Sequence, residues 1–281
     1  MNKQASVICS LALCAAIFSG CGNKSGSPIT VISREEGSGT RSAFVELTGV
    51  MQNDKDLTSA SAEISQSTAV VISTVSGNKD AVGYISLGSL SNDVKAVKLD
   101  GVAPSTQAVK DGSYKLSRPF NICTKSGLSS TASDFIDFIL SDEGQQIIET
   151  EGYIRVVSGK TYKPSDASGK ISVAGSTSVA PVMDVLADKY MELNGNNVSV
   201  EIQQTGSGAG ITSTIDGACD IGMSSRELKD EEKAKGLVPT QIAMDGIAVI
   251  VNKDNKVDSL SMEQLKNIFT GNTTDWNDVN E

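Results

Sequence analysis

Residues 29–41 are Ile29-Thr30-Val31-Ile32-Ser33-Arg34-Glu35-Glu36-Gly37-Ser38-Gly39-Thr40-Arg41, a β-branched run that leads directly into a glycine-rich loop. The run at 29–33 predicts a strand, and Arg41–Leu47 predicts a helix with Phe44 and Leu47 on one face. Glycine lets a backbone approach a ligand closely, and serine and threonine add hydroxyl donors. A helix start adds free N–H groups and a partial positive charge, so the stretch predicts a strand–loop–helix unit able to bind a small anion.

Two further loops have the same character. They are Gly175-Ser176-Thr177-Ser178 and Gly206-Ser207-Gly208-Ala209-Gly210, and each precedes a predicted helix. A single Gly-Ser-Gly is most often only a turn, but three such loops between strands and helices favour a common role. None contains the Gly-Lys-Ser/Thr of a nucleotide-binding loop, and no Gly-x-Gly-x-x-Gly follows a strand. A small oxyanion therefore fits the loops better than a nucleotide does.

Predicted strands alternate with predicted helices along the whole chain, which indicates an α/β fold with a mostly parallel sheet. Ligands of such folds bind at the carboxyl ends of strands, where the three loops fall. Lys160–Lys170 is polar and contains Pro164 and Gly169, which predicts a linker. The length of 281 residues suits one large or two modest domains, and a hydrophobic content of 39% is enough for real cores.

The composition excludes several classes of function. A net charge of −10 argues against nucleic acid or an anionic membrane surface as a partner. It does not argue against a bound anion, because fixed dipoles and one arginine outweigh a diffuse, screened field. Histidine is absent, so no serine has the usual base to activate it, and a serine hydrolase is disfavoured. Cys123 and Cys219 fit no metal-site spacing, and their apolar surroundings favour two buried free thiols over a disulfide.

Residues 1–21 predict a lipoprotein signal peptide. Lys3 supplies the positive start, Val7–Phe18 the apolar core, and Ser19-Gly20-Cys21 resembles a lipobox, in which Cys21 becomes the lipidated N-terminus. Simple secretion with cleavage nearby is the alternative. Residues 22–28 then form a tether. These features predict an extracytoplasmic protein, anchored by lipid to the outer face of the cell membrane.

The chain carries five segments, at 29–41, 173–183, 206–211, 220–228 and 244–252, that together resemble the phosphate-binding protein of the phosphate ABC transporter (PstS-type). Phe269-Thr270-Gly271, with Trp276 after it, matches that family as well. The chain stops at Asn280-Glu281, and its motifs stand in an order different from the usual one, in which the Gly-Ser-Thr-Ser segment comes first. This order indicates a circular permutation, since each motif occurs once; a tandem array cut at both ends is the alternative.

The resemblance implies a periplasmic-binding-protein-like (type II) fold, circularly permuted. Two α/β lobes joined by two crossover strands would close on the ligand like a clamp. Lobe one would comprise 29–117 plus 253–281, and lobe two 118–252. The crossings would lie near Ser117–Phe120 and Val251–Lys253.

The resemblance also assigns the phosphate contacts. Arg34 would pair with the anion, with Glu36 close enough to orient the guanidinium. Ser225 stands where some members have an aspartate that accepts the proton of monohydrogen phosphate. Asp245 or Glu36 could supply that carboxylate, although a hinge or turn role suits Asp245 equally, and Arg226 is expected to form a salt bridge. The remaining predicted contacts are Ser38, Gly39, Thr40, Thr177, Ser178 and Ser207.

In function, the resemblance implies a monomeric, non-enzymatic receptor that captures inorganic phosphate and delivers it to a membrane permease. No metal or cofactor is expected. The missing aspartate leaves other tetrahedral oxyanions open, namely sulfate, molybdate and tungstate. A surface lipoprotein that keeps the fold without transport is a further alternative.

Overall fold

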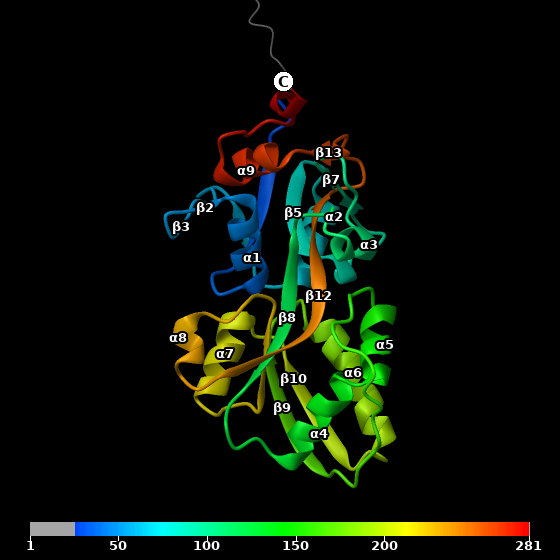
Figure 1. Cartoon of the computed structure of the whole chain (residues 1–281). Helices are drawn as coiled ribbons and strands as arrows, with labels where there is room; N and C mark the ends of the chain where they lie inside the picture. Colours follow the sequence, from blue (N-terminus) through cyan, green and yellow to red (C-terminus); the bar gives the residue numbers. More distant parts are fainter. Residues whose placement is uncertain (1–25, 281) are drawn as a thin grey trace, which may run out of the picture.

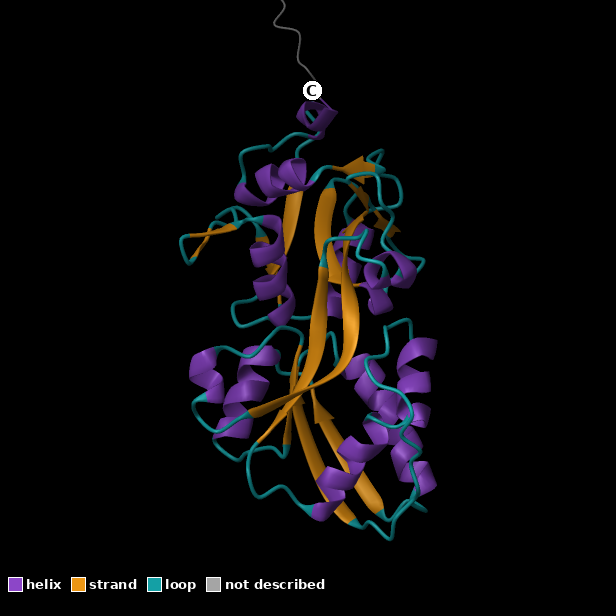
Figure 2. Cartoon of the chain, in the orientation of Figure 1, coloured by secondary structure: helices purple, strands orange, loops and turns teal. Residues whose placement is uncertain are grey.

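Two α/β lobes lie one above the other in the computed structural model, which describes residues 26–280 (Figure 1). A long mixed sheet runs through both, with the strand order β10-β9-β11-β8-β12-β5-β1-β4 and β6 beside β12. Strands β8 and β12 run antiparallel through the middle of the molecule, and helices flank the sheet in both lobes (Figure 2). The predicted α/β architecture is confirmed, but the prediction of a mostly parallel sheet is wrong, because the central strands β8 and β12 pair antiparallel with each other and with their neighbours.

Lobe one contains the β-branched run quoted above, which forms its central strand β1. That strand pairs in parallel with β4 and β5, and helices α1 and α2 follow β1 and β4. The elements of lobe one are β1 (Thr30–Arg34), α1 (Gly39–Thr48), β2 (Met51–Gln52), β3 (Lys55–Asp56), β4 (Glu63–Ser65), α2 (Thr68–Gly77), β5 (Ala81–Ser86), η1 (Leu87–Ser89), β6 (Lys95–Ala96), β7 (Lys98–Leu99), α3 (Thr106–Lys110), β13 (Ser259–Leu260), α9 (Met262–Thr270) and η2 (Trp276–Asn280).

Lobe two is built on three parallel strands, β10, β9 and β11, and the last of these pairs antiparallel with β8. Its elements, with the two long strands, are β8 (Ser117–Thr124), α4 (Ser130–Ile139), α5 (Asp142–Thr150), β9 (Gly169–Gly175), α6 (Ala180–Leu193), β10 (Val198–Gln203), α7 (Ser207–Ile215), β11 (Ile221–Ser224), α8 (Asp230–Lys233) and β12 (Val238–Val251). The predicted linker at 160–170 is irregular up to Gly169, where β9 begins.

Each lobe has its own hydrophobic core. In lobe one, Phe44 stacks on Tyr84 with ring centroids 3.9 Å apart, and the wider cluster includes Phe269 and Trp276. In lobe two, the aromatic rings of α4 pack against α6 and the sheet. The prediction that Leu47 shares the buried face with Phe44 is wrong: Leu47 is 41% exposed, because the buried stripe of α1 runs through Ala43, Phe44 and Thr48.

The two long strands pass from one lobe to the other at the same level of the sheet, where Ser117 of β8 pairs with Gly246 of β12. Leu116 belongs to the lobe-one core and Phe120 to the lobe-two core, so β8 crosses between them. Strand β12 pairs with β8 as far as Gly246 and with β5 from Ile247 onward. Its crossing therefore lies about five residues before the predicted Val251–Lys253. The apolar run 247–251 is buried between β5 and β6, which places it in lobe one and corrects the predicted boundary at residue 252.

The first and last described segments lie side by side in lobe one. Ile29 donates its backbone N–H to the carbonyl of Thr274, and Trp276 donates to the carbonyl of Ser27. Pro28 and Asp275 form an isolated bridge between the same segments. The signal peptide, the lipobox with Cys21 and most of the tether lie outside the described residues. Within the described part, no helix is both long enough and apolar enough to cross a membrane, and no cluster of three acidic, thiol or imidazole groups could hold a metal ion.

Cys123 and Cys219 are free and buried, as predicted. Burial raises the pKa of the Cys123 thiol to about 11 and also raises the pKa of Cys219, against the effect of the Thr214 hydroxyl beside both. Both thiols therefore stay protonated at pH 8. We expect iodoacetamide at pH 8 to modify neither residue in the folded protein and both in urea, as mapped by peptide mass spectrometry. Rapid labelling of either one under native conditions would contradict this.

Candidate functional site

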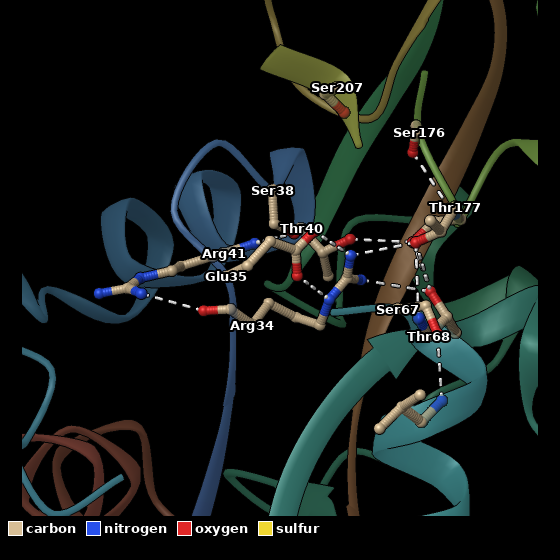
Figure 3. A network of polar contacts seen from close by, with 12 residues as sticks. Arg34, Glu35, Ser38, Thr40, Arg41, Ser67, Thr68, Ser176, Thr177 and Ser207 are labelled. Atoms are coloured by element: carbon tan, nitrogen blue, oxygen red, sulfur yellow. Dashed lines mark hydrogen bonds and ion pairs between the residues drawn. The ribbon is translucent and has the colours of Figure 1, made fainter. Parts of the chain in front are cut away.

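The three glycine-rich loops meet where the lobes face each other (Figure 3). Lobe one contributes the turn after β1 and the start of α2, and lobe two contributes the turn after β9 and the start of α7. Ser38 is the N-cap of α1 and its hydroxyl accepts a hydrogen bond from the backbone N–H of Arg41 at 3.3 Å. Ser67 caps α2 in the same way. Four helix starts, those of α1, α2, α6 and α7, thus bring polar backbone and hydroxyl groups to one place.

Arg34 ends strand β1 with its side chain 2% exposed. Its Nε and Nη2 donate to the two carboxylate oxygens of Glu35, each at 2.7 Å. Nη2 also donates to the Thr177 hydroxyl of lobe two at 3.0 Å, and Nη1 reaches the Thr68 hydroxyl at 3.4 Å. The guanidinium is therefore fixed on one edge by a carboxylate and presents its other edge to hydroxyls of both lobes.

Hydroxyl groups join the two lobes directly. Thr40 of α1 and Ser178 of lobe two hydrogen-bond at 2.9 Å, and Ser178 is 3.1 Å from the hydroxyl of Thr68. A second cluster lies in lobe two, where Ser176 donates to Ser225 at 2.9 Å and the Ser225 N–H donates to the Ser207 hydroxyl at 3.2 Å. These hydroxyl-bearing residues are all buried.

Gly39 is what allows α1 to approach the second cluster. A Cβ at this position would lie 2.5 Å from the Ser207 hydroxyl and 2.6 Å from the Ser225 hydroxyl, closer than such contacts occur. The backbones also meet, since Gly208 donates its N–H to the carbonyl of Gly37 at 3.0 Å. The structure is thus a closed arrangement, in which Arg34 and the residues of the three glycine-rich loops lie together in one buried region.

Residues 9–143 and 160–281 match the family model of a PBP superfamily domain. The chain is 50% identical to phosphate-binding protein PstS 2 of Streptococcus agalactiae serotype V (strain ATCC BAA-611 / 2603 V/R) over 275 residues, which are 94% of each chain. It is 47% identical to PstS 2 of Streptococcus pneumoniae serotype 4 (strain ATCC BAA-334 / TIGR4) over 271 residues, 92% of each. The chain belongs to the PstS family of phosphate-binding proteins. A crystal structure of a phosphate ABC transporter phosphate-binding protein from S. pneumoniae TIGR4 matches with a TM-score of 0.72 and 47% identity, over 90% of this chain and 99% of that one.

Two of the predicted carboxylate roles in this PstS-family chain need correction. Glu36 is exposed, and it is Glu35 that holds the guanidinium of Arg34, because the turn from Glu35 to Ser38 directs the first of the two carboxylates inward. Asp245 has both oxygens engaged, one by the Ser86 hydroxyl and the other by Arg118. These contacts fit a structural role of Asp245 at the hinge better than the role of a proton acceptor for the ligand.

The other predicted residues of this PstS-family chain come together as the sequence suggested. Ser225 lies beside Ser176 and Ser207, so the site has an uncharged hydroxyl at the position where an aspartate would place a charge. Arg226 points away and makes a bidentate salt bridge with Glu232 at 2.7 and 2.9 Å.

Sequence reasoning missed Thr68, Ser176 and Glu35 as members of the site. Thr68 carried a signal, because Ser67-Thr68 directly precedes an apolar helical run, which marks a helix start. Ser176 lies inside one of the three loops already singled out.

Proposed function

We propose that the two lobes close around inorganic phosphate and that the protein delivers this ligand to the permease of an ABC transporter. The observation that supports this most directly is that the buried guanidinium of Arg34 donates to hydroxyls of both lobes, those of Thr68 and Thr177, close to where four helix starts converge. The names of the streptococcal relatives agree with it. The proposed contacts are Arg34, Ser38, Gly39, Thr40, Thr177, Ser178, Ser207 and Ser225.

The chemistry of the site suits a tetrahedral oxyanion. Arg34 supplies charge, and Glu35 fixes its orientation in advance, so little side-chain freedom is lost on binding. Hydroxyls and backbone N–H groups at helix starts supply neutral donors in several directions. Because donors come from both lobes, the anion would stabilise the closed state over an open one. The role is binding and not catalysis, in agreement with the printed names of the phosphate-binding relatives.

Selectivity among oxyanions depends on Ser225. A hydroxyl can accept a hydrogen bond from the P–OH group of monohydrogen phosphate, but it can equally donate one to sulfate, so it does not repel a fully ionised anion as a carboxylate would. Both oxygens of Asp245 are already engaged, and Glu35 is occupied by Arg34. A receptor for sulfate, molybdate or tungstate is therefore the second candidate.

Calorimetry with phosphate tests the proposed function. We expect exothermic binding of phosphate with one site per chain, and a modest preference for phosphate over sulfate in competition at pH 5 and pH 8. Molybdate and tungstate serve as tetrahedral controls. Displacement of phosphate by equimolar sulfate would favour the second candidate. Absence of heat and of a thermal shift with every anion at millimolar concentration would favour a surface lipoprotein without transport.

We further propose that the chain acts as a monomer outside the cytoplasm, lipid-anchored through Cys21 to the outer face of the cell membrane. The support is the lipobox-like Ser19-Gly20-Cys21 after an apolar core.

We also propose that the motif order is a circular permutation of the usual one. The streptococcal relatives align over nearly the full length and so share this order. PstS of Bacillus subtilis (strain 168) aligns over only 115 residues, 40% of this chain and 38% of that protein, as expected when one alignment can follow only one of two exchanged segments. The contact between residues 27–29 and 274–276 supports the proposal as well, because ends that lie close together permit such a rearrangement.

A further inference from the structure

A buried ion pair lies where the two long strands cross between the lobes. Arg118 of β8 and Asp245 of β12 are opposite residues in the sheet, and their side chains are 1% and 0% exposed. Arg118 Nε and Nη2 both donate to Asp245 Oδ2, at 3.1 and 3.0 Å. The guanidinium also lies over the ring of Phe120, 5.3 Å from its centroid, so its position is fixed from two sides.

This pair joins more than the two strands. The other oxygen of Asp245 accepts the hydroxyl of Ser86 at 2.9 Å, and Ser86 ends strand β5 of lobe one. The remaining arm of Arg118, Nη1, reaches the backbone carbonyl of Ser225 at 3.4 Å. A continuous polar bridge therefore runs from lobe one, through the crossing, to the serine cluster of lobe two.

Stability alone does not account for such a pair. Removing two charges from water costs several kcal/mol, and well-packed apolar residues of similar volume are often as stabilising or more so. Burial raises the pKa of Asp245 and lowers that of Arg118, which expresses this cost, although each partner opposes the shift of the other. The geometry offers a role: the rigid, planar fork of an arginine holds a carboxylate and a carbonyl in one fixed relative orientation, which the freely rotating ammonium of a lysine does not impose.

We propose that Arg118 is a positioning residue for the oxyanion site, which holds the Ser225 segment in place and links it, through Asp245 and Ser86, to the closed arrangement of the lobes. This proposal rests on the proposed function for its ligand. Ser225 has its hydroxyl beside Ser176 and Ser207, so a shift of its backbone would displace part of the site. Arg118 acts indirectly, by holding the Ser225 backbone carbonyl, and not by contacting the anion.

Arg118→Lys is the decisive variant, because it keeps a positive charge for Asp245 and removes the fork. Ser86→Ala removes only the lobe-one end of the bridge. Tyr114→Phe is the matched control: it deletes a buried hydroxyl that donates to the Ile247 carbonyl at 2.9 Å, beside the same crossing, with no connection to Ser225. The readouts are phosphate affinity by calorimetry and backbone hydrogen exchange of the ligand-free protein by mass spectrometry.

We expect Arg118→Lys to weaken phosphate binding by about tenfold, the size of one lost charge-assisted hydrogen bond. It should also speed exchange in the peptide that contains Ser225 but not in β9. Ser86→Ala should weaken binding less, about threefold, with exchange at Ser225 unchanged. Tyr114→Phe should lower the melting temperature and leave affinity within about twofold.

An Arg118→Lys protein with the affinity and the exchange of Tyr114→Phe would overturn the positioning role. If the unaltered protein gives no heat with phosphate, the proposed function fails, and the exchange of the ligand-free variants still decides whether Arg118 holds the Ser225 segment. Unchanged exchange in Arg118→Lys would then overturn the proposal by itself.

Discussion

Arg34→Ala is expected to weaken phosphate binding by about a hundredfold to a thousandfold, because a hydrogen bond to a charged group contributes roughly 1.5–3 kcal/mol and the guanidinium can make more than one. Arg34 is buried, its orientation is fixed by Glu35, and its Nη2 already meets Thr177 of the other lobe. In the variant, the anion would be left to neutral donors beside an unpaired carboxylate. Calorimetry with phosphate gives the change directly.

Two further variants separate the causes of that loss. Arg34→Ala combined with Glu35→Gln removes the unpaired carboxylate, so any affinity it recovers measures repulsion and the remainder measures the lost donor. Arg155→Ala is the control for net charge, because Arg155 pairs with Asp142 and Glu149 on the surface of lobe two. An affinity of Arg34→Ala within threefold of the unaltered protein would show that the guanidinium does not bind the anion.

The sequence was most informative where the signal is local. The three glycine-rich loops and Arg34 stand out because glycines, hydroxyls and a β-branched run occur together within a few residues. Thr68 is the first residue of helix α2, and only the parallel pairing of β4 with β1 brings this helix start beside Thr177. Tertiary pairing of this kind has no local signature.

Two details show why neighbouring residues could not be told apart in advance. Glu35 and Glu36 are chemically alike, and the choice between them depends on the backbone of one turn, in which Gly37 has a φ of 84° and Ser38 donates its N–H to the Glu35 carbonyl. Similarly, Asp245 and Gly246 interrupt the apolar run Ile242–Asn252 at the point where β12 exchanges β8 for β5, but an aspartate followed by a glycine does not by itself distinguish a lobe crossing from a turn. The pairing partners, which come from distant segments, determine that point.

Gly39→Ala tests the closed arrangement itself. Gly39 is the first residue of α1 and has no positive φ, so alanine suits its backbone and lobe one should fold as before. In the closed state, however, the new methyl would lie 2.5 Å from the Ser207 hydroxyl and 2.6 Å from that of Ser225. Overpacking of this kind costs roughly 1–3 kcal/mol, so phosphate affinity should fall by about 10- to 100-fold.

The same substitution elsewhere separates this effect from a change in helix stability. Gly77 is the last residue of helix α2, and a methyl at this position would meet no atom within 4 Å. Gly77→Ala should therefore leave phosphate affinity unchanged. Small-angle scattering measures lobe closure as a decrease in the radius of gyration. Phosphate should compact the unaltered protein and Gly77→Ala, but not Gly39→Ala at the same phosphate concentration. If Gly39→Ala binds and compacts normally, the two serine hydroxyls can move aside, and closure does not depend on the missing side chain. If it binds weakly yet compacts fully, the methyl displaces the anion and not the lobe, which would place Gly39 directly at the ligand.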